Sequence, residues 1–271
     1  MSDVFGVSVI VENRGAGGGG TVGSASVAKA PADGYTLLMA NNSTHAVAPH
    51  IYKNPGYDAL RDFAPVSLVG WTTLVLMAHP ALPVTDMKGL IALARNRPGQ
   101  LFFSSSGTGT TLHLAGELFE SMAGVDIAHI PYKGAGQGVI DLVGGQVQLA
   151  WLSILTTMPF VKQKRLRALG LATLKRTPAL PDVPTIAESA LPGYDMPNWV
   201  GLLAPAQTPP EIVNRLNGEI TRWLAAPETQ QKMLALVVDA EGGTAASFGA
   251  SLARRHALMG QIIKRSGIKL E

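Results

Sequence analysis

One stretch in the middle of the chain predicts a strand, a loop and a helix in direct succession. Residues 101–103 are apolar and β-prone, residues 104–110 are serine, glycine and threonine, and from Thr111 onward apolar residues recur at helical spacing. The first N–H groups of such a helix lack intrahelical partners and the helix dipole is positive there, so the loop could receive an anion. An ordinary turn in which Thr110 or Thr111 caps the helix fits the same residues. The stretch indicates an α/β unit and leaves both interpretations of its loop open.

The same alternation of elements runs through the rest of the chain. Apolar, β-prone segments at residues 8–12, 35–40, 73–78 and 146–152 predict strands, the first of them buried. Amphipathic segments at residues 210–225 and 246–265 predict helices. With 271 residues the chain has room for one large domain or two ordinary ones. Strands that alternate with helices favour an α/β fold with mostly parallel sheets.

Composition excludes several classes of function. The 22 basic residues are scattered, with no run longer than two, so a basic stripe for nucleic acid is not expected. Cysteine is absent, which removes disulfides, thiolate nucleophiles and Cys-ligated metals. The six histidines show no spacing typical of metal ligands. We therefore expect no metal and no cofactor.

A glycine-rich segment raises the alternative of nucleotide binding. Gly18, Gly20 and Gly23 satisfy the G-x-G-x-x-G pattern between a predicted strand and a predicted helix. A dinucleotide site also needs an acidic residue about 20 positions further on, at the end of the next strand. That strand ends in Asn41-Asn42 instead, so the pattern does not favour a dehydrogenase.

A serine hydrolase is the second alternative. Ser104, Ser105 or Ser106 could form a triad with His113 and Asp126. The chain has no G-x-S-x-G elbow around these serines, and His113 falls on the predicted helix, where it could simply cap or pack. Catalysis is therefore not expected, and the hydrolase stays the competing hypothesis.

A second glycine-containing loop follows the predicted strand at residues 127–130. Its Tyr132 pairs an apolar face with a donor hydroxyl, which favours a binding role. Lys133 could add a charge near a ligand or could be a solvated loop lysine. Further along, Asn198-Trp199 could form a hinge or stack on a solute, and a core tryptophan is the alternative.

Several motifs recur in one order along the chain and together carry a family resemblance. They are Val11-Glu-Asn-Arg14 with its glycine loop, Asp33-Gly-Tyr-Thr-Leu-Leu38, Asp62-Phe-Ala-Pro-Val-Ser-Leu-Val69, Gly107-Thr-Gly-Thr110, His113-Leu-Ala-Gly-Glu-Leu-Phe119, Pro131-Tyr-Lys-Gly134, Leu180-Pro-Asp-Val-Pro-Thr185, Gly201-Leu-Leu-Ala-Pro205 and Gly267-Ile-Lys-Leu270. From about Ser8 to the C-terminus the chain resembles the Bug-type (TctC-like) solute-binding proteins, the periplasmic receptors of tripartite tricarboxylate transporters.

The resemblance implies a type II periplasmic-binding-protein fold, in which two α/β lobes with mostly parallel sheets close on a carboxylate-bearing solute. Lobe 1 would comprise residues 1–78 and 199–271, and lobe 2 residues 79–198. Such a receptor catalyses nothing. It would work in the periplasm with a small organic acid and the membrane permease subunits as its partners.

The resemblance also carries over the residues of the binding site. They belong to the two glycine-containing loops, to the segment after the predicted strand at 35–40 and to the strand at 146–152. The expected ligand-binding residues are Asn42, Ser43, Thr44, Ser105, Ser106, Gly107, Thr108, Gly109, Thr110, Tyr132, Lys133 and Ser153.

Two departures from the family pattern affect these expectations. Family members open with an export signal, a strand and a ligand-contacting loop that this sequence does not display, so we expect lobe 1 to have open sheet edges that favour self-association. At Trp151-Leu-Ser153, many relatives carry an Asp suited to an amino group, and Leu152 cannot play that part. A plain carboxylic or aromatic acid is therefore favoured over an amino acid.

Overall fold

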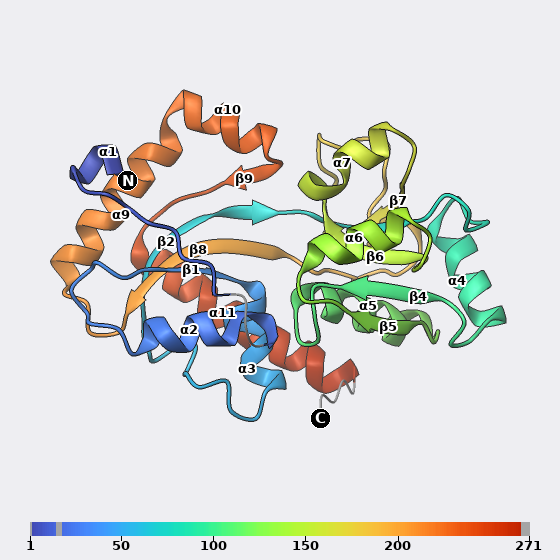
Figure 1. Ribbon diagram of the computed structural model, residues 1–271, viewed down its shortest axis with the longest axis horizontal. Coiled ribbons are helices and arrows are strands. Elements are labelled where there is room, and N and C mark those ends of the chain that lie inside the picture. The colour runs from blue at the N-terminus through green and yellow to red at the C-terminus, as the bar shows by residue number, and fades with distance from the viewer. Residues whose placement is uncertain (1, 15–17, 267–271) are drawn as a thin grey trace.

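The computed structural model describes residues 2–14 and 18–266, and these form two β-sheets set side by side along the long axis (Figure 1). Sheet A has the order β1-β8-β2-β9, and sheet B the order β5-β4-β6-β3-β7. We call the part of the chain around sheet A lobe 1 and the part around sheet B lobe 2. The strands of sheet A are β1 (Leu38–Asn41), β2 (Phe63–Thr72), β8 (Asn198–Pro205) and β9 (Val238–Ala240). Those of sheet B are β3 (Leu74–Ala78), β4 (Phe102–Ser105), β5 (Ala128–Pro131), β6 (Leu149–Ser153) and β7 (Arg167–Leu171).

Helices cover both sheets. Around sheet A lie α1 (Ser2–Phe5), the 3₁₀ turn η1 (Gly18–Gly20), α2 (Thr21–Ala28), the π-helix η2 (Ser43–Val47), α3 (Ala48–Ile51), α9 (Pro210–Ala225), α10 (Pro227–Ala235) and α11 (Ala245–Ser266). Around sheet B lie α4 (Met87–Asn96), α5 (Thr111–Ala123), α6 (Ala135–Val143), α7 (Ile154–Lys162) and α8 (Ile186–Ser189). The α/β class expected from the sequence is confirmed.

The strand directions correct the expectation of mostly parallel sheets. Every pairing in sheet A is antiparallel. In sheet B, β4 pairs in parallel with β5 and β6, whereas β3 is antiparallel to β6 and β7. The reason is that β2 leads into lobe 2 and β8 returns from it, so these neighbours run in opposite directions. Between them the chain builds the whole of sheet B, and it re-enters sheet A at Asn198, opposite the end of β2 at Thr72.

Two chain segments connect the lobes. Only Thr73 separates β2 from β3, so the chain passes from sheet A to sheet B ahead of residue 78. At the return, Asn198 donates from Nδ2 to Thr72 Oγ1 over 2.7 Å and ties the two connecting segments together. Next to it, Trp199 is buried and packs against Phe248 of α11, so it is a core tryptophan. The lobe boundaries at 78 and 199 stay a prediction.

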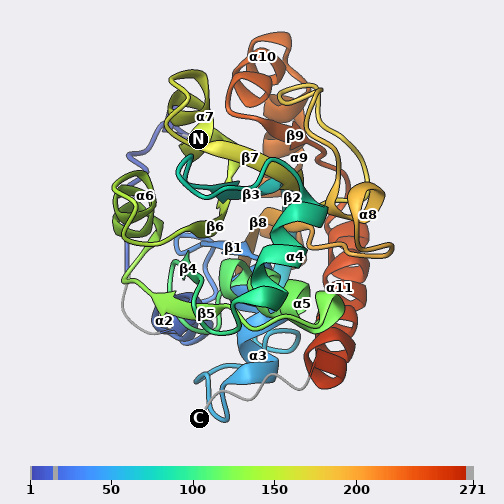
Figure 2. The same ribbon diagram turned by 90° about the vertical axis from the view of Figure 1, so that its right-hand side faces the viewer.

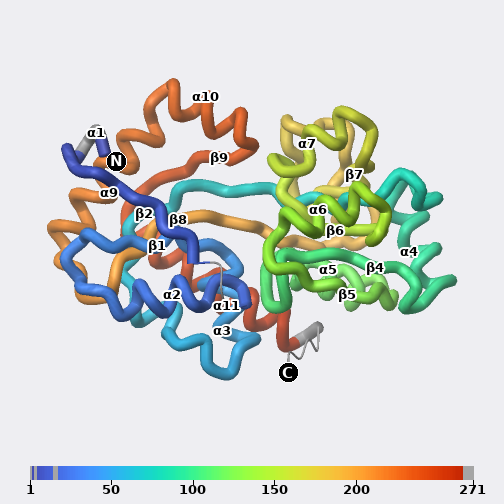
Figure 3. The backbone as a smooth tube through the Cα atoms, in the orientation of Figure 1, coloured from blue at the N-terminus to red at the C-terminus, as the bar shows by residue number. Residues whose placement is uncertain are grey.

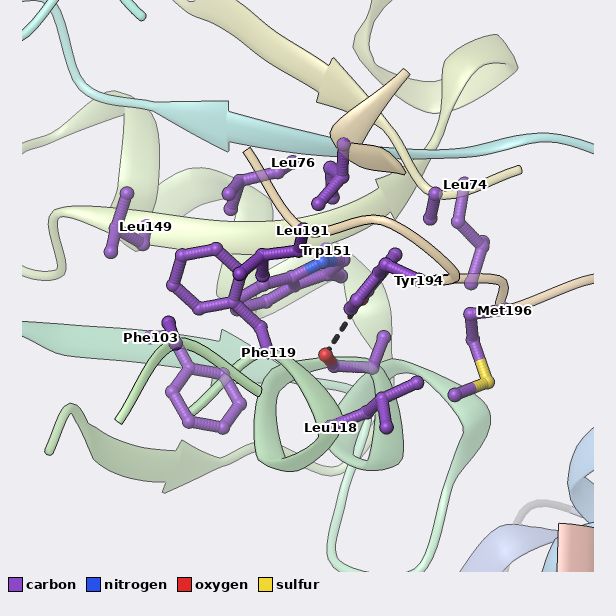
Figure 4. Close-up of a cluster of buried hydrophobic side chains, with 14 of the residues drawn as sticks. Leu74, Leu76, Phe103, Leu118, Phe119, Leu149, Trp151, Leu191, Tyr194 and Met196 are labelled. Carbon is purple, nitrogen blue, oxygen red and sulfur yellow. Dashed lines mark hydrogen bonds between the residues drawn. The ribbon is translucent and has the colours of Figure 1, made fainter. Parts of the chain in front are cut away.

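The core of lobe 2 is built from aromatic side chains between sheet B and α5 (Figure 4). Trp151 on β6 meets Phe103 of β4 and Phe119 of α5 with ring centroids 5.4 and 5.5 Å apart. Tyr194 is fully buried and donates its hydroxyl to the Ala115 carbonyl over 2.7 Å, which satisfies its only polar atom (Figure 4). Each such side chain contributes about 1.5–3 kcal/mol by its burial.

Lobe 1 also contributes to that core. Met259 and Ile262 from α11, with Val47 from η2, belong to the same buried cluster as Leu114 and Leu118 of α5. Figure 2 shows α11 running down the side of the molecule next to α5. The lobes are therefore joined by a buried apolar contact as well as by two connecting segments.

The segment at residues 8–12 corrects a second expectation. It was predicted as a buried strand, yet residues 8–14 form neither helix nor strand, and Ile10 and Val11 are 85% and 81% exposed. In the view of Figure 3 the segment passes in front of sheet A as a dark-blue stretch. A β-prone sequence becomes a strand only where a neighbour completes its ladder, and no described strand pairs with it.

The edge of sheet A near this segment is open. Among the described strands β1 pairs with β8 alone, and Met39 on β1 is 58% exposed.

Two motifs noted in the sequence reach beyond the described residues: residues 15–17 of the glycine loop and Gly267-Ile-Lys-Leu270.

Candidate functional site

A cleft of about 1110 Å³ is lined by loops from both lobes. Lobe 1 contributes Ser43 and Thr44 where β1 ends, and lobe 2 contributes Ser106, Gly107 and Thr110 from the β4–α5 loop. Tyr132 and Lys133 from the β5–α6 loop share the same wall. The three loops that the family resemblance assigned to one site therefore meet in one cavity.

Glycines shape the β4–α5 loop. Gly107 and Gly109 have φ values of 125° and 75°, which residues with a Cβ rarely adopt. Thr110 then caps α5: its hydroxyl accepts from the His113 N–H over 3.3 Å and donates to the Gly107 carbonyl over 2.8 Å. Thr110 is therefore the helix cap of the ordinary-turn interpretation and also lines the cleft, while anion binding by the loop stays a prediction.

Ser43 reaches across from lobe 1 to the start of α5. The Thr111 N–H donates to Ser43 Oγ over 2.9 Å, and the two hydroxyl oxygens lie 2.8 Å apart. Asn42 adds a weaker contact from Nδ2 to Thr111 Oγ1 at 3.4 Å. A residue of one lobe therefore satisfies an end group of a helix in the other, while also lining the cleft.

Ser43 is held in place by the π-helix η2, a rare turn that is frequent at functional sites. Thr44 and Asn41 close its start, because the N–H of each donates to the side-chain oxygen of the other over 3.1 Å. The next residue, His45, is buried and lies 2.9 Å from Thr44 Oγ1 through Nδ1. Burial, with the charge of His256, lowers the pKa of His45 to about 3, so this imidazole is neutral at physiological pH.

Tyr132 differs in one respect from its expected role as a donor. Its hydroxyl donates to Asp141 Oδ2 over 2.7 Å, and Asp141 also accepts from Gln137 over 2.9 Å. Desolvation, followed by that hydrogen bond and the Asp141 charge, raises the pKa of Tyr132 to about 12. The hydroxyl proton is thus engaged with α6, and what Tyr132 offers the cleft is its ring and its oxygen lone pairs.

Two cations line the cleft, and their surroundings differ. Arg14 is paired with Glu12, with Nε 2.8 Å from Oε1. Lys133 is exposed, and no ion pair of the described residues involves it. Lys133 is therefore a cleft-lining cation that no carboxylate of the described residues pairs with.

Five of the expected residues do not line the cleft. Asn42 and Ser105 are buried. Thr108 and Gly109 are the part of the β4–α5 loop that contacts Tyr52. Ser153 precedes α7, and its carbonyl accepts from the hydroxyls of Thr156 and Thr157. A direct ligand contact by these residues stays a prediction.

The serine expected in a hydrolase lies beside a different histidine. Ser105 Oγ is 2.7 Å from His129 Nε2, whereas His113 lies 3.2 Å from Glu117 Oε1 and stacks on His129 at 4.0 Å. Burial, with the His113 charge, lowers the pKa of His129 to about 3. Because Ser105 is buried, contacts Gly107 through its hydroxyl and does not line the cleft, the pair fixes the loop. Asp126 lies next to Gly99, and no hydrogen bond or ion pair of the described residues joins it to Ser105 or His129.

In residues 2–14 and 18–266, no three His, Asp or Glu side chains are grouped so as to hold a metal ion. In the same part of the chain, no helix has the length and apolar character needed to cross a bilayer.

The two-sheet architecture and its cleft define an α/β protein of the periplasmic-binding-protein class. The fold is shared with Rpa4515 of R. palustris, solved with adipate, at a TM-score of 0.94 and 35% identity over 99% of this chain and 89% of that one. Periplasmic binding protein BugD matches at a TM-score of 0.92 and 31% identity over 100% and 90%. MatC from Rhodopseudomonas palustris, solved with malate, matches at 0.90 and 26% identity over 97% and 90%.

Sequence comparison then gives the family. The model of the tripartite tricarboxylate transporter family receptor matches residues 1–268, and the chain belongs to this family of binding proteins, which are not enzymes. Protein BugT of Bordetella pertussis is 37% identical over 90% of this chain and 73% of its own length. The UPF0065 protein in the tcbD-tcbE intergenic region of Pseudomonas sp. (strain P51) is 42% identical over 90% and 72%. The family resemblance drawn from the motifs is confirmed.

Proposed function

We propose that this chain captures a small carboxylate-bearing solute in the cleft between its lobes and delivers it to the permease subunits of a tripartite tricarboxylate-type transporter. The observation that carries the proposal is the meeting of the β4–α5 loop with Ser43 and Thr44 in one cavity. The donors of Gly107 and Thr110 are used within the loop, so what the loop offers an anion is the positive end of α5 and the cleft-lining Ser106.

A site of this kind suits an anion that must be released again. Amide and hydroxyl donors neutralise a carboxylate without a buried full charge pair, whose desolvation would be costly. Lys133, at the exposed rim, would raise the rate of encounter with an acid without being buried beside it.

The solute class follows from the relatives and from Leu152. Relatives solved with adipate and with malate make dicarboxylates the first solutes to test. Leu152 is buried in the core of lobe 2 and so offers no charge to an amino group. We infer that plain carboxylic or aromatic acids bind better than amino acids.

Membership of the family supports a proposal for the place of action and the partners. Periplasmic binding proteins act outside the inner membrane, so we propose that this chain works in the periplasm and meets its permease there. We further propose self-association through the open edge of sheet A, where β1 exposes Met39.

A thermal-melting screen tests the proposed solute. Adipate, malate, benzoate and glutamate are compared with NAD and ATP, and calorimetry follows for each acid that raises the melting temperature. A bound acid at a hundredfold excess over its Kd stabilises the fold by about 2.7 kcal/mol. Stabilisation by NAD or ATP alone would contradict the proposal. So would ester hydrolysis that Ser105→Ala abolishes.

A further inference from the structure

Tyr52 connects the two lobes directly behind the cleft. It follows α3 in lobe 1, and its hydroxyl donates to the Thr108 carbonyl of the β4–α5 loop over 2.7 Å. Tyr52 is half-buried and is not among the residues that line the cleft. It therefore holds the loop without lining the cleft itself.

The Tyr52 ring fills a space that two glycines leave open. A Cβ added at Gly18, in the glycine turn of lobe 1, would lie 1.6 Å from the Tyr52 hydroxyl oxygen. A Cβ added at Gly109, in the loop of lobe 2, would lie 2.6 Å from the same atom. No larger residue fits at either position while the ring stays where it is.

The same loop is held from lobe 1 at a second point. Ser43 accepts from the Thr111 N–H over 2.9 Å, so residues 108 and 111 are both anchored to lobe 1. Between the two anchors lie Gly109 and Thr110, and Thr110 lines the cleft. The shape of this cleft wall thus depends on how closely lobe 1 approaches it.

We propose that Tyr52 is a positioning residue that couples the approach of the lobes to the shape of the anion-binding loop. The proposal rests on the proposed function, because the loop is taken to hold a carboxylate. Tyr52 contacts no solute itself. Its hydrogen bond to Thr108 and its fit between Gly18 and Gly109 let the loop hold its binding shape only when both lobes are in place.

Tyr52→Phe isolates the hydrogen bond, because it keeps the ring between the glycines. The loss of one interlobe hydrogen bond predicts adipate release that is roughly three- to tenfold faster, with little change in the association rate. Stopped-flow or surface-plasmon kinetics with adipate measures both rates. Release at the wild-type rate would overturn the proposal.

Gly18→Ala tests the packing of the ring. The new methyl group would force the ring out of its place, so this variant should weaken adipate binding as much as Tyr52→Ala does. In the double variant Gly18→Ala/Tyr52→Ala the second change should cost nothing more, because the clash has lost its partner. If the two effects simply add, Gly18 acts on the solute directly and the proposal fails. Gly218→Ala, at a position in α9 with nothing within 4 Å of the added Cβ, is the matched control.

A second readout needs no solute. Amide hydrogen exchange in the ligand-free protein should quicken at residues 109–111 in Tyr52→Phe, while the amides of β6 stay protected. If neither adipate nor malate binds the wild-type protein, the proposed solute class fails and this measurement still decides the role of Tyr52. A lower melting temperature with unchanged exchange in the loop would mark Tyr52 as merely structural and overturn the proposal.

Discussion

Ser43 and Thr111 belong to different lobes and meet at two hydrogen bonds, one from the Thr111 N–H to Ser43 Oγ at 2.9 Å and one between their hydroxyls at 2.8 Å. The N-terminus of α5 is therefore capped by two residues. One is Thr110, the N-cap, and the other is Ser43, 68 positions before Thr111 in the chain. A change at Ser43 should act on the stability of α5 and on the cleft at once.

Ser43→Ala removes the accepting oxygen and leaves the Thr111 N–H without its partner. We expect the free energy of unfolding to fall by about 1 kcal/mol, as for the loss of a helix cap, and adipate to bind several-fold more weakly. Urea denaturation and calorimetry measure the two effects. Ser121→Ala, an exposed serine on the same helix, serves as control, and equal stability of the two variants would contradict the prediction.

Lys133→Met should slow the association of adipate and leave its release nearly unchanged. An exposed charge at the rim acts by attraction over distance, so we expect roughly a two- to fivefold lower association rate at low ionic strength. The difference from wild type should vanish at ~0.5 M salt, where the Debye length is a few ångströms. Lys53→Met is the control, because Lys53 is exposed and does not line the cleft. A rate deficit that persists in high salt would point to direct contact instead.

The raised pKa of Glu120 predicts that the free energy of unfolding falls as the pH rises. Desolvation, helped by the charges of Glu117 and Asp126, raises the pKa of Glu120 to about 7, above its unfolded value near 4.5. The folded state thus binds the extra proton between pH 4.5 and 7, and stability falls as the pH rises through that window. Since Glu120 is partly exposed, the loss is on the order of 1 kcal/mol after screening.

Glu120→Gln tests the assignment of this pH dependence to Glu120. Glutamine stays neutral, and its side-chain oxygen can still accept the hydrogen bond that the Ile127 N–H donates to Glu120 Oε1. The variant should be more stable than wild type at pH 7.5 and lose the decline between pH 5 and 7.5, measured as urea midpoints. Glu211→Gln, at an exposed carboxylate in the first turn of α9, is the matched control. A decline that survives in Glu120→Gln would assign it to another group.

Lys164→Gly should stabilise the protein. Lys164 is exposed and has a φ of 57°, in the left-handed region where a Cβ costs about 1 kcal/mol and glycine does not pay that cost. Gln231→Gly, at an exposed position in the middle of α10, should instead destabilise by about 1 kcal/mol. Urea midpoints of the two variants should move in opposite directions, and a parallel shift would contradict the argument.

Met39→Lys tests the open edge of sheet A. If copies associate through β1, the wild-type protein should form dimers at high micromolar concentration, and a charge on the edge strand should return it to monomer. Sedimentation velocity resolves the two species. Leu174→Lys changes an exposed apolar residue in lobe 2 and should leave the dimer intact. A wild-type protein that stays monomeric would remove self-association from the proposal.

Local patterns predicted most helices and strands well. The helix at residues 210–225 has the bounds that its apolar spacing indicated, since Val213, Leu216, Ile220 and Leu224 form one buried face. The strand, loop and helix around residues 101–119 also form as predicted, because the glycines and Thr110 determine that geometry locally.

Relationships between distant segments could not be predicted in the same way. The antiparallel sheet A depends on where β2 and β8 cross between lobes, and the exposure of residues 8–12 depends on the lack of a neighbouring strand among those described. The pairing of Ser105 with His129 rather than His113 depends on the parallel register of β4 and β5. No local sequence pattern pointed to Tyr52, because its contact is a hydrogen bond to a residue 56 positions away in the chain.

The joint packing of α11 with α5 limits how the receptor can open. Met259 and Ile262 are embedded among Leu114 and Leu118, so separating the lobes at that point would expose apolar surface to water. We therefore expect the lobes to open by rotating about the apolar contact between α11 and α5, which keeps these side chains packed, and not by separating there.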